Sequence, residues 1–212
     1  MERITKADCL RVSRPLQNLA KRAHESPKVT NNGKVRATLR RLSSSVRPNN
    51  IDMNQISFTP IGIIHSPFTE TDEMPIQPIG AQGIKGHILI ADDFVEGLED
   101  LDGFSHIYLL YHLHLSSSYS LKVAPFLDDQ LRGVFSTRAP KRPNPIGLSV
   151  VKLNKIIMNR LEIENVDIID GTPLLDIKPY VPEVDKIENS RIGWLSKNIK
   201  EIHSRKSDQR FK

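Results

Sequence analysis

Between Ile56 and Asp185, hydrophobic residues come in short runs separated by glycine, proline and polar positions. Runs of this length that are rich in β-branched residues and bounded by turn formers are typical of β-strands. A short helix or turn is expected at 93–101. The pattern predicts strands over the segments 56–65, 84–91, 104–115, 134–137, 148–157 and 161–169.

The predicted strands follow one another with almost no long helix between them. Asn159 and Arg160 are expected to form a hairpin turn between the last two strands. Short strands at this spacing favour an antiparallel barrel or a curled sheet. The predicted fold class is therefore mainly β: a small antiparallel β-barrel with a C-terminal amphipathic helix and a disordered N-terminal tail.

The C-terminal part of the chain has a different hydrophobic period. Ile192, Leu195, Ile199 and Ile202 recur at spacings of three and four residues, which is typical of one face of a helix. Ser190 is a candidate residue for capping the start of this helix. The last residues, 204–212, are predicted to be frayed.

Charge is unevenly distributed along the 212 residues, whose formal net charge is +5. Residues 1–50 hold 12 Lys and Arg against 3 Asp and Glu, and residues 51–212 hold 18 against 22. The leading segment has too few apolar residues to build a core, so a solvated, disordered tail is the simplest interpretation. A basic arm that holds RNA phosphates and an Arg- and Ser-rich transit peptide are the alternatives.

These compositions predict three parts: a basic extension over 1–52, a β-barrel domain over 53–188, and a C-terminal helix and tail over 189–212. Cys9 is the only cysteine, so the chain cannot form an intrachain disulfide. This favours a reducing, cytoplasmic setting. No apolar run reaches the roughly 18 residues that a membrane-spanning helix needs, so no membrane association is expected.

A proline-rich segment at 133–149 contains a compact cationic cluster of Arg138, Lys141 and Arg142. Most such charges are simply solvated. Here the flanking prolines restrict the backbone, which favours a shaped contact with a phosphate or carboxylate.

A second proline-rich segment, 170–182, opens with Asp-Gly-Thr-Pro, in which the glycine is expected to supply a positive φ. Asp176, Lys178 and Tyr180 follow with a period of two, which places them on one face of an extended segment. A carboxylate, an ammonium and a phenol in one row indicate either a functional face or a packed sheet face.

Three histidines, His106, His112 and His114, share even parity on one predicted strand. Unbroken strand geometry would point all three to the same face. A metal site is one interpretation, but neither a nearby cysteine nor a His-Glu-x-x-His motif accompanies it. Local hydrogen bonding or the lining of a pocket is the commoner role, and no metal is predicted.

Four segments in matching order resemble the TrmO (TsaA-like) family: Ile61–Phe68, Asp102–His106, Thr137–Ser149 and Asp170–Tyr180. The likeness extends over about 56–185. It implies a small, dimeric β-barrel that is an S-adenosylmethionine-dependent tRNA methyltransferase. The family's substrate is N6 of threonylcarbamoyladenosine at position 37, in the anticodon loop, so tRNA and a second copy of the chain are the expected partners.

The resemblance also implies a cofactor site. Ile76 and Leu115 depart from the family pattern, which commonly has Arg and Gln at these positions. For the substrate, we hypothesise that Lys141, Arg142 and Asn144 are the binding residues, with Lys141 and Arg142 holding a phosphate or carboxylate. The implied cofactor-binding residues are Pro75, Ile76, Gln77, His114, Leu115, Arg138, Leu148, Asp170, Gly171, Thr172 and Pro173.

Methyl transfer to an acylated nitrogen requires loss of its proton as the new bond forms. We hypothesise that the catalytic residues are Asp176, Lys178 and Tyr180, with Asp176 or Tyr180 taking the proton. Lys178 would tune that residue or hold the threonyl carboxylate. Two competing functions are a non-catalytic RNA-binding β-barrel, which would stack bases on exposed aromatic side chains, and a metal-dependent hydrolase built on the strand histidines.

Overall fold

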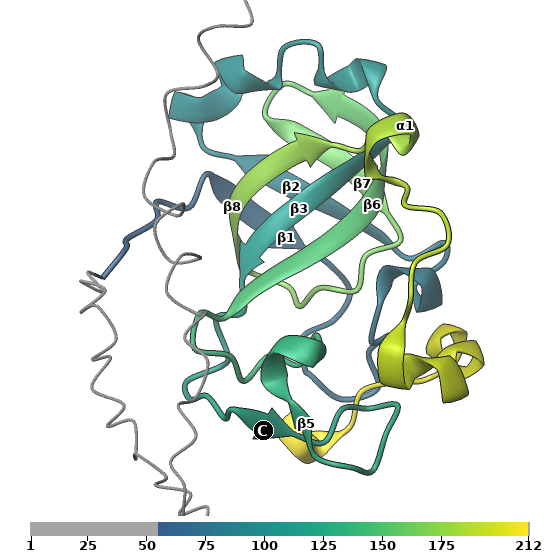
Figure 1. Ribbon diagram of the computed structural model, residues 1–212. Helices are drawn as coiled ribbons and strands as arrows, with labels where there is room; N and C mark the ends of the chain where they lie inside the picture. Colours follow the sequence, from purple (N-terminus) through teal and green to yellow (C-terminus); the bar gives the residue numbers. More distant parts are fainter. Residues whose placement is uncertain (1–54, 212) are drawn as a thin grey trace, which may run out of the picture. The chain divides into compact units, whose positions relative to one another are not determined.

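The computed structural model describes residues 55–211, and the predictions made for residues 1–52 lie outside this range (Figure 1). Six antiparallel strands close into a barrel in the order β1-β2-β7-β6-β3-β8. The predicted mainly β fold with a small antiparallel barrel is therefore confirmed. The strands are β1 (Gly62–His65), β2 (Lys85–Ile90), β3 (His106–His112), β6 (Ile146–Ile157), β7 (Arg160–Glu164) and β8 (Thr172–Pro179).

Alternation of apolar and polar residues determines which side chains fill the barrel. On β3 the odd-numbered residues Ile107, Leu109 and Tyr111 are buried, whereas their neighbours face outward. Strand β6 pairs with β3 so that Ser149 lies opposite Leu109 and Val151 opposite Ile107. Directly paired residues point to the same side of a sheet, and these side chains meet inside the barrel. The core also contains Ile64, Ile88, Ile90, Leu153, Leu161, Ile163, Val166, Ile168 and Leu174.

Two irregularities in strand pairing accompany the curvature of the barrel. Between β3 and β8 the register shifts after Leu110, and between β6 and β7 it shifts after Leu153. An extra residue on one strand bends it and increases its twist. This lets β6, the longest strand at 12 residues, pair with both β3 and β7.

The β6–β7 hairpin turns at Met158 and Asn159, one residue earlier than predicted. Met158 has a φ of 56°. A two-residue hairpin turn requires such a left-handed conformation at its first central residue. Asn159 fastens the turn to β2, because its side-chain amide donates to the carbonyl of Ile90 over 3.0 Å.

The predicted strand over 134–137 is wrong. Val134–Ser136 forms a 3₁₀-helix, η5, that follows a two-stranded sheet of β4 (Lys122–Val123) and β5 (Arg132–Gly133). The Thr137 hydroxyl donates to the Val134 carbonyl over 2.8 Å and stabilises this turn. Val134 is buried as a strand residue would be, but it packs with Val123 and Ala139 in a small separate core.

The remaining helices are short. The 93–101 segment is helical as expected, within η3 (Asp92–Leu98) and η4 (Leu101–Gly103). The C-terminal α-helix is replaced by two 3₁₀-helices, η6 (Gly193–Lys197) and η7 (Ile199–His203), without a side-chain cap from Ser190. The others are η2 (Pro78–Gly80), α1 (Pro182–Asp185) and η8 (Gln209–Phe211). Within residues 55–211, none of these helices has the length and apolarity needed to cross a bilayer.

The end of the chain is ordered by backbone pairing, in contrast to the predicted fraying. Ser207 exchanges backbone hydrogen bonds with Glu73 and Met74, and Lys206 pairs with Pro75 in a β-bridge. The Ser207 hydroxyl adds a bond of 2.6 Å to the Thr71 carbonyl. Residues 206–208 thereby run beside the segment that precedes η2.

Candidate functional site

A cavity of about 350 Å³ opens at the end of the barrel where β3 ends and where β6 and β8 begin. Segments from six parts of the chain surround it: the loop before η2, the end of β3, the loop between β4 and β5, the proline-rich loop after η5, the segment between β7 and β8, and the C-terminal tail. Eight of the eleven predicted cofactor residues line it, namely Pro75, Ile76, Gln77, His114, Leu115, Arg138, Leu148 and Thr172.

Arg138 and Gln77 form one wall of this cavity. The Arg138 guanidinium donates to the Gln77 side-chain oxygen over 2.7 Å, although the two residues are 61 positions apart. Arg138 is otherwise exposed, so its remaining donors are available to a ligand. A planar guanidinium held in this way suits a carboxylate or phosphate.

His114 and Thr172 meet on another wall, where their side chains are 3.4 Å apart. The Thr172 hydroxyl donates its only proton to the Ile169 carbonyl over 2.7 Å. It can therefore only accept from His114, which places the proton of a neutral imidazole on Nδ1 and leaves Nε2 as an acceptor.

Asp170, Gly171 and Pro173 do not line the cavity. Asp170 instead fastens the start of the Asp-Gly-Thr-Pro turn to β1, because its carboxylate accepts from the Ser66 amide over 3.1 Å and lies 3.0 Å from the His65 ring. Burial raises the pKa of Asp170, but the Ser66 amide and His65 outweigh it and the net shift is downward. Gly171 has the expected positive φ, at 75°.

Of the predicted substrate residues, Arg142 lines the cavity and Lys141 and Asn144 do not. The Arg142 guanidinium donates to the backbone carbonyls of Val134 and Thr137 over 3.1 and 2.8 Å. One nitrogen of this half-buried guanidinium, Nη1, therefore helps to shape the proline-rich loop.

The predicted catalytic residues lie elsewhere on the barrel. Asp176 and Lys178 share the outer face of β8 and form an ion pair of 2.8 Å, and Tyr180 packs against the ring of Tyr108. None of the three lines the cavity within residues 55–211. Asp176 instead borders a hollow beside η3 and η4.

The three histidines proposed as an alternative metal site are not on one face. His106 and His112 project from the outside of β3, whereas His114 follows the strand and lines the cavity. Among residues 55–211 no group of three or more His, Cys, Asp or Glu is arranged to hold a metal ion.

A buried hydrogen-bonded row was missed by the sequence analysis. Tyr111, Ser149 and Asp167 come from β3, β6 and the segment after β7. The Ser149 hydroxyl lies 3.0 Å from the Tyr111 hydroxyl and donates to Asp167 Oδ1 over 2.7 Å. Asp167 lines the cavity, and burial raises its pKa to about 6 against the opposing influence of Ser149 and Arg138. Burial also raises the pKa of Tyr111.

The C-terminal tail was missed as well. Ser207, Asp208 and Phe211 line the cavity, and Phe211 stacks edge-on against Phe126 with ring centroids 5.0 Å apart. Arg210 binds the Asp208 carboxylate over 2.7 Å, which neutralises that carboxylate. The tail thus provides part of the cavity wall.

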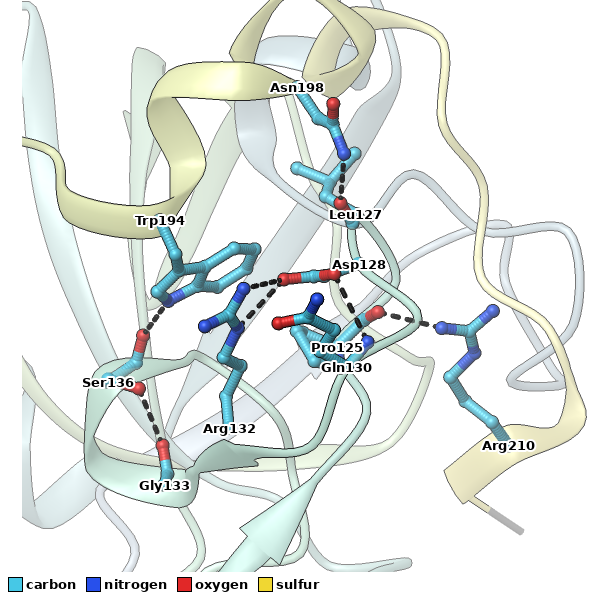
Figure 2. Close-up of polar contacts among 10 residues, drawn as sticks. All are labelled: Pro125, Leu127, Asp128, Gln130, Arg132, Gly133, Ser136, Trp194, Asn198 and Arg210. Carbon is cyan, nitrogen blue, oxygen red and sulfur yellow. Dashed lines mark hydrogen bonds and ion pairs between the residues drawn. The ribbon is translucent and has the colours of Figure 1, made fainter.

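Figure 2 shows the hydrogen bonds between the C-terminal segment, residues 193–211, and residues 125–136 on either side of β5. Arg210 and Asn198 each donate to a loop carbonyl over 2.7 Å, from Pro125 and Leu127 respectively. The Trp194 indole donates to the Ser136 carbonyl over 2.8 Å, and Arg132 lies over its ring. Three separate side chains, Trp194, Asn198 and Arg210, therefore hold the C-terminal segment, residues 193–211, against this loop.

Relatives of the chain bear names connected with S-adenosylmethionine. A probable S-adenosyl-L-methionine-binding protein of Pyrococcus abyssi is 53% identical over 156 residues, which cover 74% of this chain and 85% of that protein. The tRNA (adenine(37)-N6)-methyltransferase of Escherichia coli is 32% identical over 152 residues, and the match covers 67% of this chain and 65% of that enzyme.

Solved structures agree with these similarities. The crystal structure of TrmO from Pseudomonas aeruginosa is 40% identical with a TM-score of 0.57, and the match covers 66% of this chain and 63% of that one. The chain therefore spans about two thirds of the bacterial proteins it resembles. The model of the tRNA-methyltransferase O N-terminal domain matches residues 63–186, which include nearly the whole barrel. This chain belongs to the TrmO family.

Proposed function

We propose that this protein is a tRNA methyltransferase that transfers a methyl group from S-adenosylmethionine to the N6 nitrogen of adenine 37. The observation that carries the proposal is one cavity whose walls unite eight family-implied cofactor residues from distant parts of the chain. Relatives named as methyltransferases and as S-adenosylmethionine-binding proteins support it.

The cavity suits a cofactor such as S-adenosylmethionine, which carries one carboxylate and two cationic groups, an ammonium and a sulfonium. Its apolar residues, including Leu115 and Leu148, can cover a planar base, while Arg138 offers donors for a carboxylate and Asp167 offers a carboxylate for a cation. S-adenosylmethionine supplies an activated methyl group on a sulfonium. The chain contributes orientation and exclusion of water, which account for much of the rate in such a displacement.

The finer substrate is threonylcarbamoyladenosine in the anticodon loop of tRNA, as the family resemblance implies. Lys141 and Asn144, at the rim of the proline-rich loop, would contact its phosphate or carboxylate. A cytoplasmic location, where tRNA is modified, fits a chain with one cysteine.

The protein is further proposed to act as a homodimer. Leu148 lines the cavity and is still 48% exposed, and Ile146 beside it is 38% exposed. Both lie on the outer face of β6, where Leu148 is paired with Leu110 of β3 and Ile146 with His112. A second copy covering this face would shield the apolar rim and bring a partner's β8 toward the cavity. The proposed roles of Asp176, Lys178 and Tyr180 as catalytic residues depend on that arrangement.

The test is mass analysis of nucleosides from tRNA incubated with the protein and isotope-labelled S-adenosylmethionine. Label is expected on N6-methylated threonylcarbamoyladenosine, and unmodified tRNA tests whether the threonylcarbamoyl group is required. A non-catalytic RNA-binding module would bind tRNA without any thermal shift from S-adenosylmethionine. That result, with no label transferred, would refute the proposal.

Single-turnover rates of Asp176→Asn and Tyr180→Phe test the catalytic assignment separately. Wild-type rates in both variants would eliminate it. Light scattering of the purified protein gives the mass in solution, and a monomer at working concentration would remove the shared-site arrangement.

A further inference from the structure

Asp167 is the end point of a directed row of hydrogen bonds. Ser149 has one hydroxyl proton and donates it to Asp167 Oδ1. The Tyr111 hydroxyl must therefore donate to Ser149. Tyr111 and Ser149 are buried, and Asp167 is accessible only in part because it borders the cavity. The row presents Asp167 as an oriented acceptor at the cavity wall.

Among residues 55–211, Asp167 forms no ion pair with a Lys, Arg or His side chain. Arg138 acts on it only through space, since the Arg138 guanidinium donates to Gln77 instead. Arg142 is occupied by backbone carbonyls, and the other cavity carboxylate, Asp208, is paired with Arg210. A desolvated carboxylate without an ion pair is costly for the free protein, and a cationic ligand would relieve that cost.

We propose that Asp167 is a cofactor-binding residue that pairs with the cationic part of S-adenosylmethionine, and that this pairing drives a proton off the Asp167 carboxyl. The inference rests on the proposed function and extends it to a residue outside the predicted set. Tyr111 and Ser149 act as positioning residues, because they hold the carboxylate toward the cavity.

The proposal makes cofactor affinity depend on pH. A cation binds the ionised carboxylate, so the apparent affinity follows the ionised fraction of Asp167. With a pKa of about 6, the affinity at pH 5 should be about tenfold lower than at pH 7. His114, Arg138, Arg142 and Asp208 also border the cavity, so the effect must be assigned by substitution of Asp167 itself.

Calorimetric titration of the full chain with S-adenosylmethionine at pH 6, in two buffers of different ionisation enthalpy, counts the protons exchanged. Wild type should release about half a proton on binding, and Asp167→Asn should release none and bind about tenfold or more weakly. Ser149→Ala removes a donor that stabilises the carboxylate, so its affinity midpoint should move to higher pH. Glu183→Gln, on α1 and exposed, is the matched control and should behave as wild type.

S-adenosylhomocysteine distinguishes the two cationic groups of the cofactor, because it keeps the ammonium and lacks the sulfonium. If Asp167→Asn weakens both ligands equally, the partner is the ammonium, and if it weakens only the methylated one, the partner is the sulfonium. Either result supports the proposal. Equal affinity and equal proton release in wild type and Asp167→Asn would overturn it, whereas a wild type that binds neither ligand would instead overturn the proposed function.

Discussion

At the scale of a single residue, the ionisation of Asp167 affects the stability of the folded protein. Its pKa of about 6 in the folded protein exceeds the ordinary value of 3.8. A carboxyl shifted in this direction contributes most to stability below pH 3.8, and the contribution is lost as the pH rises through 6. The free protein is therefore expected to tolerate the ionised form of this residue poorly.

We predict that Asp167→Asn stabilises the free protein at pH 7.5 by about 1–3 kcal/mol, because the neutral amide avoids burial of a charge and still accepts from Ser149. At pH 4 the gain should shrink toward zero, since the wild-type carboxyl is then protonated. Urea unfolding of both proteins at each pH provides the comparison. A gain that is the same at both pH values would contradict this account.

Gly147 leaves the space that the Tyr111 ring occupies, because it has no side chain. A Cβ at Gly147 would overlap the Tyr111 ring, which lies opposite it on β3. Gly147→Ala should displace the ring, break the contact with Ser149 and destabilise the protein by about 1–3 kcal/mol in urea unfolding. Gly97→Ala is the control, because an added Cβ there meets nothing within 4 Å and stability should change little.

The reason the sequence did not predict Asp167 lies in one turn. The sequence analysis predicted one continuous strand over 161–169, in which Asp167 would be an ordinary member of a strand face. The strand ends at Glu164, and Asn165 has a φ of 70°, which breaks the alternation and buries Val166 and Ile168 instead. Hydrophobic periodicity does not reveal such a left-handed residue. The resemblance to the TrmO family, by contrast, named eight residues that line one cavity.

At the scale of elements, β2, β3 and β6 were predictable, whereas β8 was predicted only as an extended segment, the strand predicted over 134–137 is a 3₁₀-helix, and the C-terminal α-helix is absent. Strands β2, β3 and β6 lie within or close to their predicted ranges, because each combines β-branched residues with alternation. The spacing of Ile192, Leu195, Ile199 and Ile202 fits an α-helix, yet Asn198 separates two 3₁₀-helices and donates to the Leu127 carbonyl. Tertiary anchoring overrides the local period here.

The tail after η7 is held by polar contacts that local hydrophobicity does not record. Arg210 contributes two of them, to the Pro125 carbonyl and over the Phe126 ring at 5.3 Å. We predict that Arg210→Ala loosens the tail and weakens S-adenosylmethionine binding several-fold, because Ser207, Asp208 and Phe211 are part of the cavity wall.

Hydrogen–deuterium exchange at Ser207, whose amide donates to the Met74 carbonyl over 2.8 Å, should become faster in this variant. Lys200→Ala removes an exposed charge from η7 and serves as the control for charge loss nearby. Weakened cofactor binding without faster exchange at Ser207 would mean that Arg210 acts by its charge rather than by holding the tail.

At the scale of the whole molecule, the basic and acidic charges belong to different parts of the chain. The barrel and tail, residues 51–212, carry 18 Lys and Arg against 22 Asp and Glu, whereas residues 1–50 carry 12 against 3. An acidic barrel suits a cationic cofactor, but it repels the phosphates of tRNA. The proposed function therefore needs a source of positive charge beyond the cavity itself.

We predict that the leading segment supplies it. Replacing Arg36, Arg40, Arg41 and Arg47 by Gln in the full chain should weaken tRNA binding. Each arginine that neutralises a phosphate releases counterions from the RNA, and this release favours binding, so fewer arginines release fewer counterions. Filter binding across a series of salt concentrations should show a shallower dependence of log affinity on log salt, by roughly 0.7–0.9 for each phosphate left without its arginine. S-adenosylmethionine affinity should stay unchanged, since the cavity is built by residues 71–211. An unaltered salt slope would leave the solvated tail as the correct interpretation of this segment and would move the search for the tRNA-binding charge to the proline-rich loop or to a partner copy.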